Sequence, residues 1–87
     1  MDETNLKTIF RDKKLRMSLP RSLIYEELSK AEGPLNPQEI YRCLLKDERR
    51  IGLTSIYRCL HLFETLGIAF KVVLGPQVKY KLCHLED

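Results

Sequence analysis

The sequence has 87 residues, of which 44% are hydrophobic and 31% charged, and its formal net charge is +3. This length fits one domain with a modest core, so we expect a single domain over residues 1–87, and the composition excludes a disordered chain. No apolar run could span a membrane and the start lacks the pattern of a signal peptide, so a cytoplasmic protein is expected.

The positive charge is concentrated near the amino end of the chain. The stretch from Lys7 to Arg21 holds six Lys and Arg residues, Lys14 and Arg16 among them, against one acidic residue, Asp12. Such a stretch is often a solvated surface, but it is also the usual footprint of a segment that contacts nucleic-acid phosphates.

Three helices are predicted in the first half of the chain. The first covers residues 4 to about 15, and the second runs from Pro20 to about residue 31 behind the capping residue Ser18. The third begins at Asn36-Pro37-Gln38-Glu39, where Asn36 caps, Pro37 takes the first helical position and Glu39 completes a capping box.

A fourth helix is predicted from Leu53 to Leu66, because apolar residues recur there with helical spacing. Thr54 or Ser55 can cap its start, and Gly67 stands where a left-handed residue ends a helix. Its other face is polar, as on many ordinary surface helices. A short turn with Gly52 joins it to the third helix, however, and such a pair is typical of a helix-turn-helix, whose second helix enters the DNA major groove. The polar face comprises Ser55, Tyr57, Arg58, His61 and Thr65.

After Gly67 the apolar residues recur with a period of two. Residues 68–73 and 78–82 alternate on either side of the turn Gly75-Pro76-Gln77, which predicts a hairpin with one apolar and one largely basic face. A lone hairpin is marginally stable, so it must pack on the helices. The expected fold class is mainly α with a small β-hairpin (α+β): a winged helix-turn-helix of about four helices followed by a two-stranded antiparallel wing.

The three cysteines are odd in number, far apart and without a C-x-x-C pair. Cys43 and Cys59 fall on apolar helix faces, where a reduced cysteine acts as a small hydrophobe. Cys83-His84 offers two neighbouring metal ligands with no evident third, so no metal site is expected in this chain.

Five segments resemble, in order and spacing, the amino-terminal DNA-binding half of the ferric uptake regulator family. The resemblance extends over nearly the whole chain from about Leu6, and Tyr57-Arg58 lies in its most specific block. The segments are 18–21, 37–41, 51–60, 63–68 and 80–84.

The resemblance implies that Tyr57 reads base edges, that Arg58 and Ser55 hold phosphates, and that Arg16 enters the minor groove of A·T-rich sites. The chemistry agrees, because a tyrosine ring can contact a thymine methyl and a narrow minor groove attracts arginine. The further DNA-contacting candidates are Lys14, Thr54, His61, Lys71 and Lys79.

The resemblance also implies a regulator of transcription, a repressor or an activator, that binds a double-stranded A·T-rich inverted repeat, as a homodimer or by pairing with another regulator. Family members use a divalent metal such as iron or zinc, but the half that dimerises and binds metal is absent from this sequence. Positions where the family often has a histidine and a glutamate hold Pro34 or Leu35 and Lys81. We therefore expect no cofactor in this chain.

Two other function classes compete with DNA binding. A winged helix that pairs with and modulates a full-length regulator would carry an exposed apolar patch, for which Leu62, Val73 and Leu74 are candidates. An enzyme is not expected, because the two histidines lie far apart and the sequence has neither a Gly-rich phosphate loop nor a nucleophile elbow.

Overall fold

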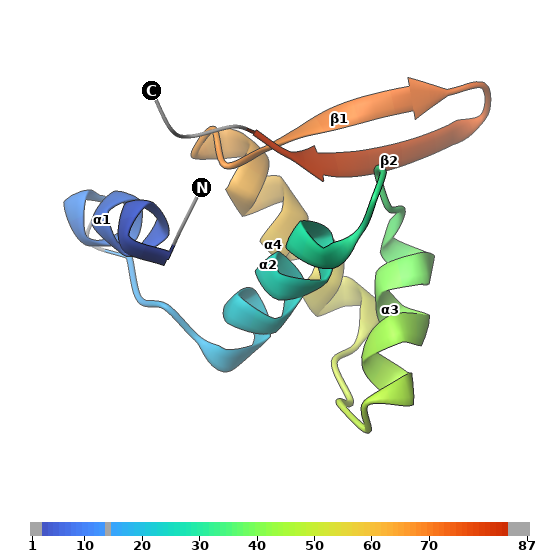
Figure 1. The fold of residues 1–87 in the computed structure, drawn as a ribbon, viewed down its shortest axis with the longest axis horizontal. Coiled ribbons are helices and arrows are strands. Elements are labelled where there is room, and N and C mark those ends of the chain that lie inside the picture. The colour runs from blue at the N-terminus through green and yellow to red at the C-terminus, as the bar shows by residue number, and fades with distance from the viewer. Residues whose placement is uncertain (1–2, 14, 84–87) are drawn as a thin grey trace.

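The computed structural model describes residues 3–13 and 15–83, and for residues 3–7 the backbone alone. Within these residues, helices α1 (Glu3–Asp12), α2 (Leu19–Lys30), α3 (Pro37–Lys46) and α4 (Leu53–Thr65) precede an antiparallel hairpin of β1 (Ala69–Leu74) and β2 (Gln77–Leu82) (Figure 1). This order confirms the predicted winged helix-turn-helix. In Figure 1, α1 lies to one side of the other helices, and the turn of the hairpin lies at the opposite side.

Side-chain caps fix the starts of α2 and α3 as predicted. Ser18 Oγ accepts a hydrogen bond from the Arg21 amide over 3.4 Å. At α3 the capping box is complete: Asn36 Oδ1 accepts from the Glu39 amide at 2.7 Å, and Glu39 Oε1 accepts from the Asn36 amide at 2.8 Å. The helix-turn-helix therefore begins at a well-defined residue.

The end of α4 also matches the prediction. Gly67 has φ +77°, and the amides of Gly67 and Ile68 donate to the carbonyls of Glu64 (3.1 Å) and Phe63 (2.8 Å). This is a Schellman motif, whose left-handed residue favours glycine. The first helix, by contrast, ends at Asp12, earlier than the expected position near residue 15.

The core is built around Phe63, which is fully buried on α4. Its ring meets Phe10 of α1 and Tyr25 of α2 edge to face, with centroids 6.4 and 6.2 Å apart. Cys59 is buried beside it as predicted, and burial raises the pKa of its thiol to about 12, while Cys43 is half-buried. The buried apolar residues are Phe10, Ile24, Leu28, Ile40, Leu44, Ile56, Cys59, Leu60, Phe63, Ile68, Ala69 and Tyr80.

The hairpin register differs from the prediction. Leu74 pairs with Gln77, so the turn contains only Gly75 and Pro76, whereas a three-residue turn was expected. Gly75 has φ +63°, which suits the first central position of a type II′ turn. A shift of one residue exchanges the two faces of a strand. The expected apolar and basic faces are therefore mixed.

The pairs across the hairpin show this mixing. Buried Tyr80 lies opposite Lys71, and Val72 lies opposite Lys79. Outside the hairpin, Leu35 forms an isolated β-bridge to Tyr80 through two backbone hydrogen bonds of 2.9 and 2.7 Å. The segment before α3 thus holds the outer edge of β2, and the wing is bound directly to the helix-turn-helix.

Candidate nucleic-acid interface

The polar face of α4 is exposed and its apolar face is fixed in the core. Ile56 and Leu60 are buried, whereas Tyr57 retains 48% of its surface. Thr54, Ser55, Arg58 and His61, the other candidates on this helix, are also exposed. A rigid helix therefore presents all of the predicted α4 residues to solvent.

The start of α4 corrects one prediction. Gly52 is the N-cap, the Ile56 amide donates to its carbonyl at 3.1 Å, and no side chain in the described residues caps the helix. Thr54 and Ser55 lie inside the first turn, so their hydroxyls are not used for capping. The first turn has no acidic residue. Its amide groups and the positive end of the helix dipole are therefore available to an anion.

A groove of about 300 Å³ joins this face to the start of α2. Arg21 lies in it near Ser55 and Arg58, although the sequence did not single it out. Its guanidinium donates to the backbone carbonyl of Arg16 and lies 5.7 Å from the ring centroid of Phe10. Arg21 thereby holds the basic linker, the segment between α1 and α2 that contains Arg16. The lining residues are Ser18, Pro20, Arg21, Ser55, Arg58, Cys59 and Leu62.

A second groove, of about 330 Å³, joins α4 to the wing. It brings Tyr57 together with the amino end of α3 and with Pro76, Gln77 and Val78 at the hairpin turn. Gln38 Nε2 lies 3.3 Å from the Tyr57 hydroxyl and donates a hydrogen bond to it. This contact joins the two helices of the helix-turn-helix at the residue predicted to read bases.

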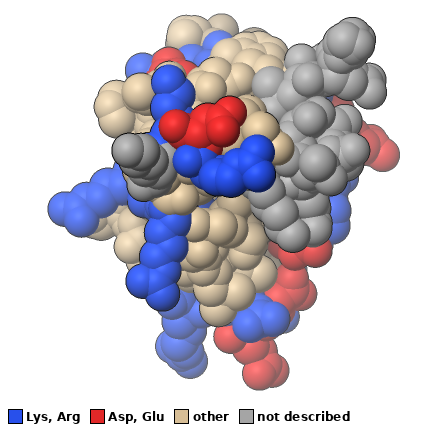
Figure 2. Space-filling model, turned by 90° about the vertical axis from the view of Figure 1, so that its left-hand side faces the viewer, with Lys and Arg blue, Asp and Glu red and all other residues tan. Residues whose placement is uncertain are grey.

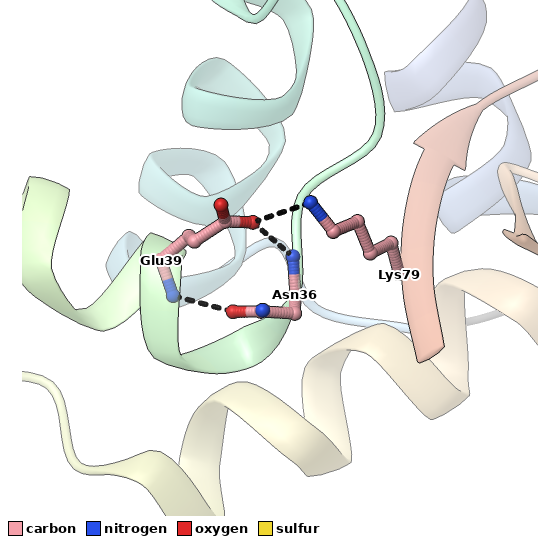
Figure 3. A network of polar contacts seen from close by, with 3 residues as sticks. All are labelled: Asn36, Glu39 and Lys79. Atoms are coloured by element: carbon pink, nitrogen blue, oxygen red, sulfur yellow. Dashed lines mark hydrogen bonds and ion pairs between the residues drawn. The ribbon is translucent and has the colours of Figure 1, made fainter. Parts of the chain in front are cut away.

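Both candidate lysines of the wing have acidic partners. Lys79 Nζ lies 3.5 Å from Glu39 Oε1, the atom that also accepts the Asn36 amide, and only 19% of the lysine side chain is exposed (Figure 3). Lys71 Nζ lies 4.0 Å from Glu64 Oε1. The sequence did not reveal these pairs, because Glu39 and Lys79 lie in elements distant in the chain, and the contact of Lys71 with Glu64 depends on how β1 packs beside α4. Each carboxylate would compete with a phosphate for its lysine, more strongly at the largely covered Lys79 than at Lys71.

The basic candidates outside the wing are less constrained. Arg16 and Arg58 are exposed, and no ion pair involves either of them among residues 8–13 and 15–83. Lys14 lies outside the described residues. Figure 2 shows the side of the molecule that carries α1, where basic side chains run down the left of the view and acidic ones gather at the lower right.

Apolar side chains cover the outer part of the wing. Val73 keeps 67% of its surface exposed and pairs with exposed Val78 on one face of the hairpin, whereas Leu74, at 50%, and Phe70 are exposed on the other face. Leu62, expected in the same patch, is only partly exposed and lines the groove at Arg58.

In the part of the chain that the structure describes, no helix is long and apolar enough to cross a membrane.

A metal ion in a protein requires several ligand side chains that lie close together. Across the described positions, no three His, Cys, Asp or Glu side chains lie close enough together to hold one. Cys83 is partly buried and lines a small cavity with Tyr25 and Lys81, and His84 lies outside the described residues. Lys81 cannot act as a ligand while it is charged.

Comparison with known proteins identifies the family. The ferric uptake regulator family model matches residues 12–87. The chain belongs to this family. A comparison with curated protein sequences finds no match.

Solved structures of other family members have the same fold. The Vibrio cholerae ferric uptake regulator is 26% identical with a TM-score of 0.81, and the match covers 99% of this chain and 65% of that one. The manganese-containing regulator from Pseudomonas aeruginosa is 26% identical with a TM-score of 0.79, covering 91% and 60%. The iron-containing regulator from Francisella tularensis is 28% identical with a TM-score of 0.74, covering 84% and 57%. The chain thus spans less than two thirds of the length of these relatives.

Proposed function

We propose that this chain is a sequence-specific double-stranded DNA-binding module of a transcriptional repressor. The observation that carries the proposal is the exposed polar face of α4, which has an uncapped amino end on a helix-turn-helix and lies beside a basic linker. Family membership supports it, and the Vibrio cholerae relative is described as having DNA-binding domains.

In this proposal α4 enters the major groove with its amino end first. Tyr57 contacts base edges there, its ring against a thymine methyl. Ser55, Arg58 and the free amides of the first turn hold phosphates, with Thr54 and His61 at the margin of this contact. A helix of this size reads a few base pairs, so tight binding requires a second copy, or another regulator, on the other half of an inverted repeat.

The linker supplies the contact outside the major groove. Arg16 is exposed, and Arg21 holds its backbone beside the groove that contains Arg58. An arginine at this place suits the narrow minor groove of an A·T-rich flank, where the negative potential is strongest. Lys71 and Lys79 are secondary contacts, because Glu64 and Glu39 compete with a phosphate for them.

Fluorescence anisotropy tests the proposal with an A·T-rich inverted-repeat duplex and a scrambled duplex of equal composition, over a range of salt. Arg58→Ala should weaken binding to both duplexes and reduce the salt slope by about 1, as expected for one lost phosphate contact. Arg42→Ala is the matched control, because Arg42 is exposed on α3 and lines neither groove. A slope unchanged in Arg58→Ala, with the fold retained by circular dichroism, would contradict the role of Arg58.

The same assay separates binding by this chain from metal-dependent binding. Because the described residues hold no metal cluster, we expect equal affinities with a chelator and with added Mn²⁺ or Zn²⁺. An affinity that rises with metal would show that a site has been missed and would make Cys83 the first residue to replace.

The exposed wing favours one second candidate function, a protein-interaction module that pairs with a full-length regulator. Exposed Val73 and Val78 pair on one face of the hairpin there, and Phe70 and Leu74 are exposed on the other face. Size-exclusion chromatography of this chain mixed with a full-length family member tests it. A complex that Val73→Lys abolishes would support this function, and unchanged elution of both proteins would exclude it for that partner.

A further inference from the structure

We propose that Gln38 is a positioning residue for Tyr57, and that the site preference of this chain depends on the hydrogen bond between them. The inference rests on the proposed function, because it assumes that Tyr57 reads base edges. It assigns a role in specificity to a residue on α3, the helix that precedes the reading helix.

Gln38 is held on a rigid support. It is the second residue of α3, directly after buried Pro37, and the capping box between Asn36 and Glu39 fixes the helix start on both sides of it. Glu39 also contacts Lys79 of the wing. These contacts of Asn36, Glu39 and Lys79 (Figure 3) hold the backbone on either side of Gln38.

Tyr57 also extends from a helix fixed in the core, but packing holds its ring only in part. The preceding residue, Ile56, is fully buried, and Cys59 and Leu60 fix the next turn of α4. Tyr57 keeps 48% of its surface exposed and shares a groove with Pro37 and Pro76, so packing selects its direction only in part. Among the described residues, Gln38 donates a side-chain hydrogen bond to the Tyr57 hydroxyl, over 3.3 Å. Removing the bond should therefore widen the range of ring orientations.

The direction of the hydrogen bond matters for recognition. A tyrosine hydroxyl is both a donor and an acceptor. Because Gln38 donates to its oxygen, the phenolic hydrogen remains free to donate outward to an acceptor on a base or a phosphate. Contact with a thymine methyl also depends on the orientation of the ring. The pair is uncharged, so it should affect the choice of sequence rather than the salt-dependent, sequence-independent part of binding.

A double-mutant cycle tests the inference. The probes are a duplex that the wild-type chain selects from a random-sequence pool and a scrambled duplex of the same composition. The variants are Gln38→Met, which keeps the length of the side chain but cannot donate, Tyr57→Phe, and the two together. Gln77→Met is the matched control, because Gln77 lines the same groove but forms no hydrogen bond with Tyr57.

Each single variant should lower the preference for the selected duplex by about three- to tenfold, the range expected for one net hydrogen bond. The double variant should lose no more than the larger single effect, and the salt slope should stay unchanged. Gln77→Met should show no coupling to Tyr57→Phe. Additive effects of Gln38→Met and Tyr57→Phe, or full preference in Gln38→Met, would overturn the inference while leaving the proposed function intact.

A measurement without DNA gives a second readout. In an NMR spectrum of the free chain, Tyr57→Phe should shift the side-chain amide resonances of Gln38 and leave those of Gln77 unchanged. Unmoved Gln38 resonances would show that the bond is absent and would overturn the inference. A wild-type chain that enriches no sequence from the pool would instead overturn the proposed function, and the inference with it.

Discussion

Glu39→Ala should destabilise the domain by about 1–2 kcal/mol. Glu39 Oε1 has two partners, the Asn36 amide at 2.8 Å and Lys79 Nζ at 3.5 Å. Loss of a capping interaction costs about 0.5–2 kcal/mol. The ion pair is partly exposed, with 19% and 32% of the two side chains accessible, so its share is about 0.5 kcal/mol. The backbone cap is therefore the larger contribution.

Three variants separate the two contributions by thermal unfolding. Glu39→Gln retains an oxygen for the Asn36 amide and loses the charge, whereas Lys79→Met removes the ion pair alone. Each should cost about 0.5 kcal/mol. For a domain of this size, 1 kcal/mol lowers Tm by roughly 4–8 °C, so the difference from Glu39→Ala is measurable. Glu32→Ala, at an exposed residue with no ion pair in the described chain, is the control.

The losses of stability in these variants show whether the backbone cap or the charge of Glu39 stabilises the start of α3. If Glu39→Gln loses as much stability as Glu39→Ala, the charge and not the cap stabilises the start of α3. If Glu39→Ala unfolds at the wild-type temperature, the capping box contributes nothing and the reasoning is refuted.

Two further predictions concern the core. Phe63→Ala should lower the free energy of unfolding in urea by about 3–5 kcal/mol, because it leaves a cavity between Phe10 and Tyr25. Phe63→Leu should lower it clearly less. Equal losses for the two variants would argue against ring packing. Burial raises the pKa of the Cys59 thiol from 9.0 to about 12. The unfolded chain therefore loses the thiol proton at a lower pH than the folded chain does, and the free energy of unfolding should fall as pH rises from about 9 to 12. Cys59→Ala should flatten this fall, and an unaltered pH profile would exclude the thiol as its cause.

The fold followed from local signals in the sequence. Ser18, Asn36 and Gly67 each act within a few residues of their own position, and all three form the predicted caps. Helical periodicity placed Ile56 and Phe63 in the core correctly, because an amphipathic helix must bury its apolar side.

Features that depend on distant pairing were missed. The register of the hairpin was wrong by one residue, because alternation alone does not distinguish a turn of two residues from a turn of three. The bond from Gln38 to Tyr57 and the ion pair of Lys79 with Glu39 join elements whose proximity exists only in the folded chain. The roles of Tyr57 and Arg58 in DNA binding stay predictions.

The bridge between Leu35 and Tyr80 has a consequence for the order in which the domain assembles. These residues are far apart in the chain, and their two hydrogen bonds form only when α3, α4 and β1, which lie between them, are in place. Closing so long a loop gains little until the intervening contacts exist. The α3–α4 pair can form from nearer contacts, so we expect docking of the wing to be a late step of folding. The groove between Tyr57 and the hairpin turn is completed only at that step.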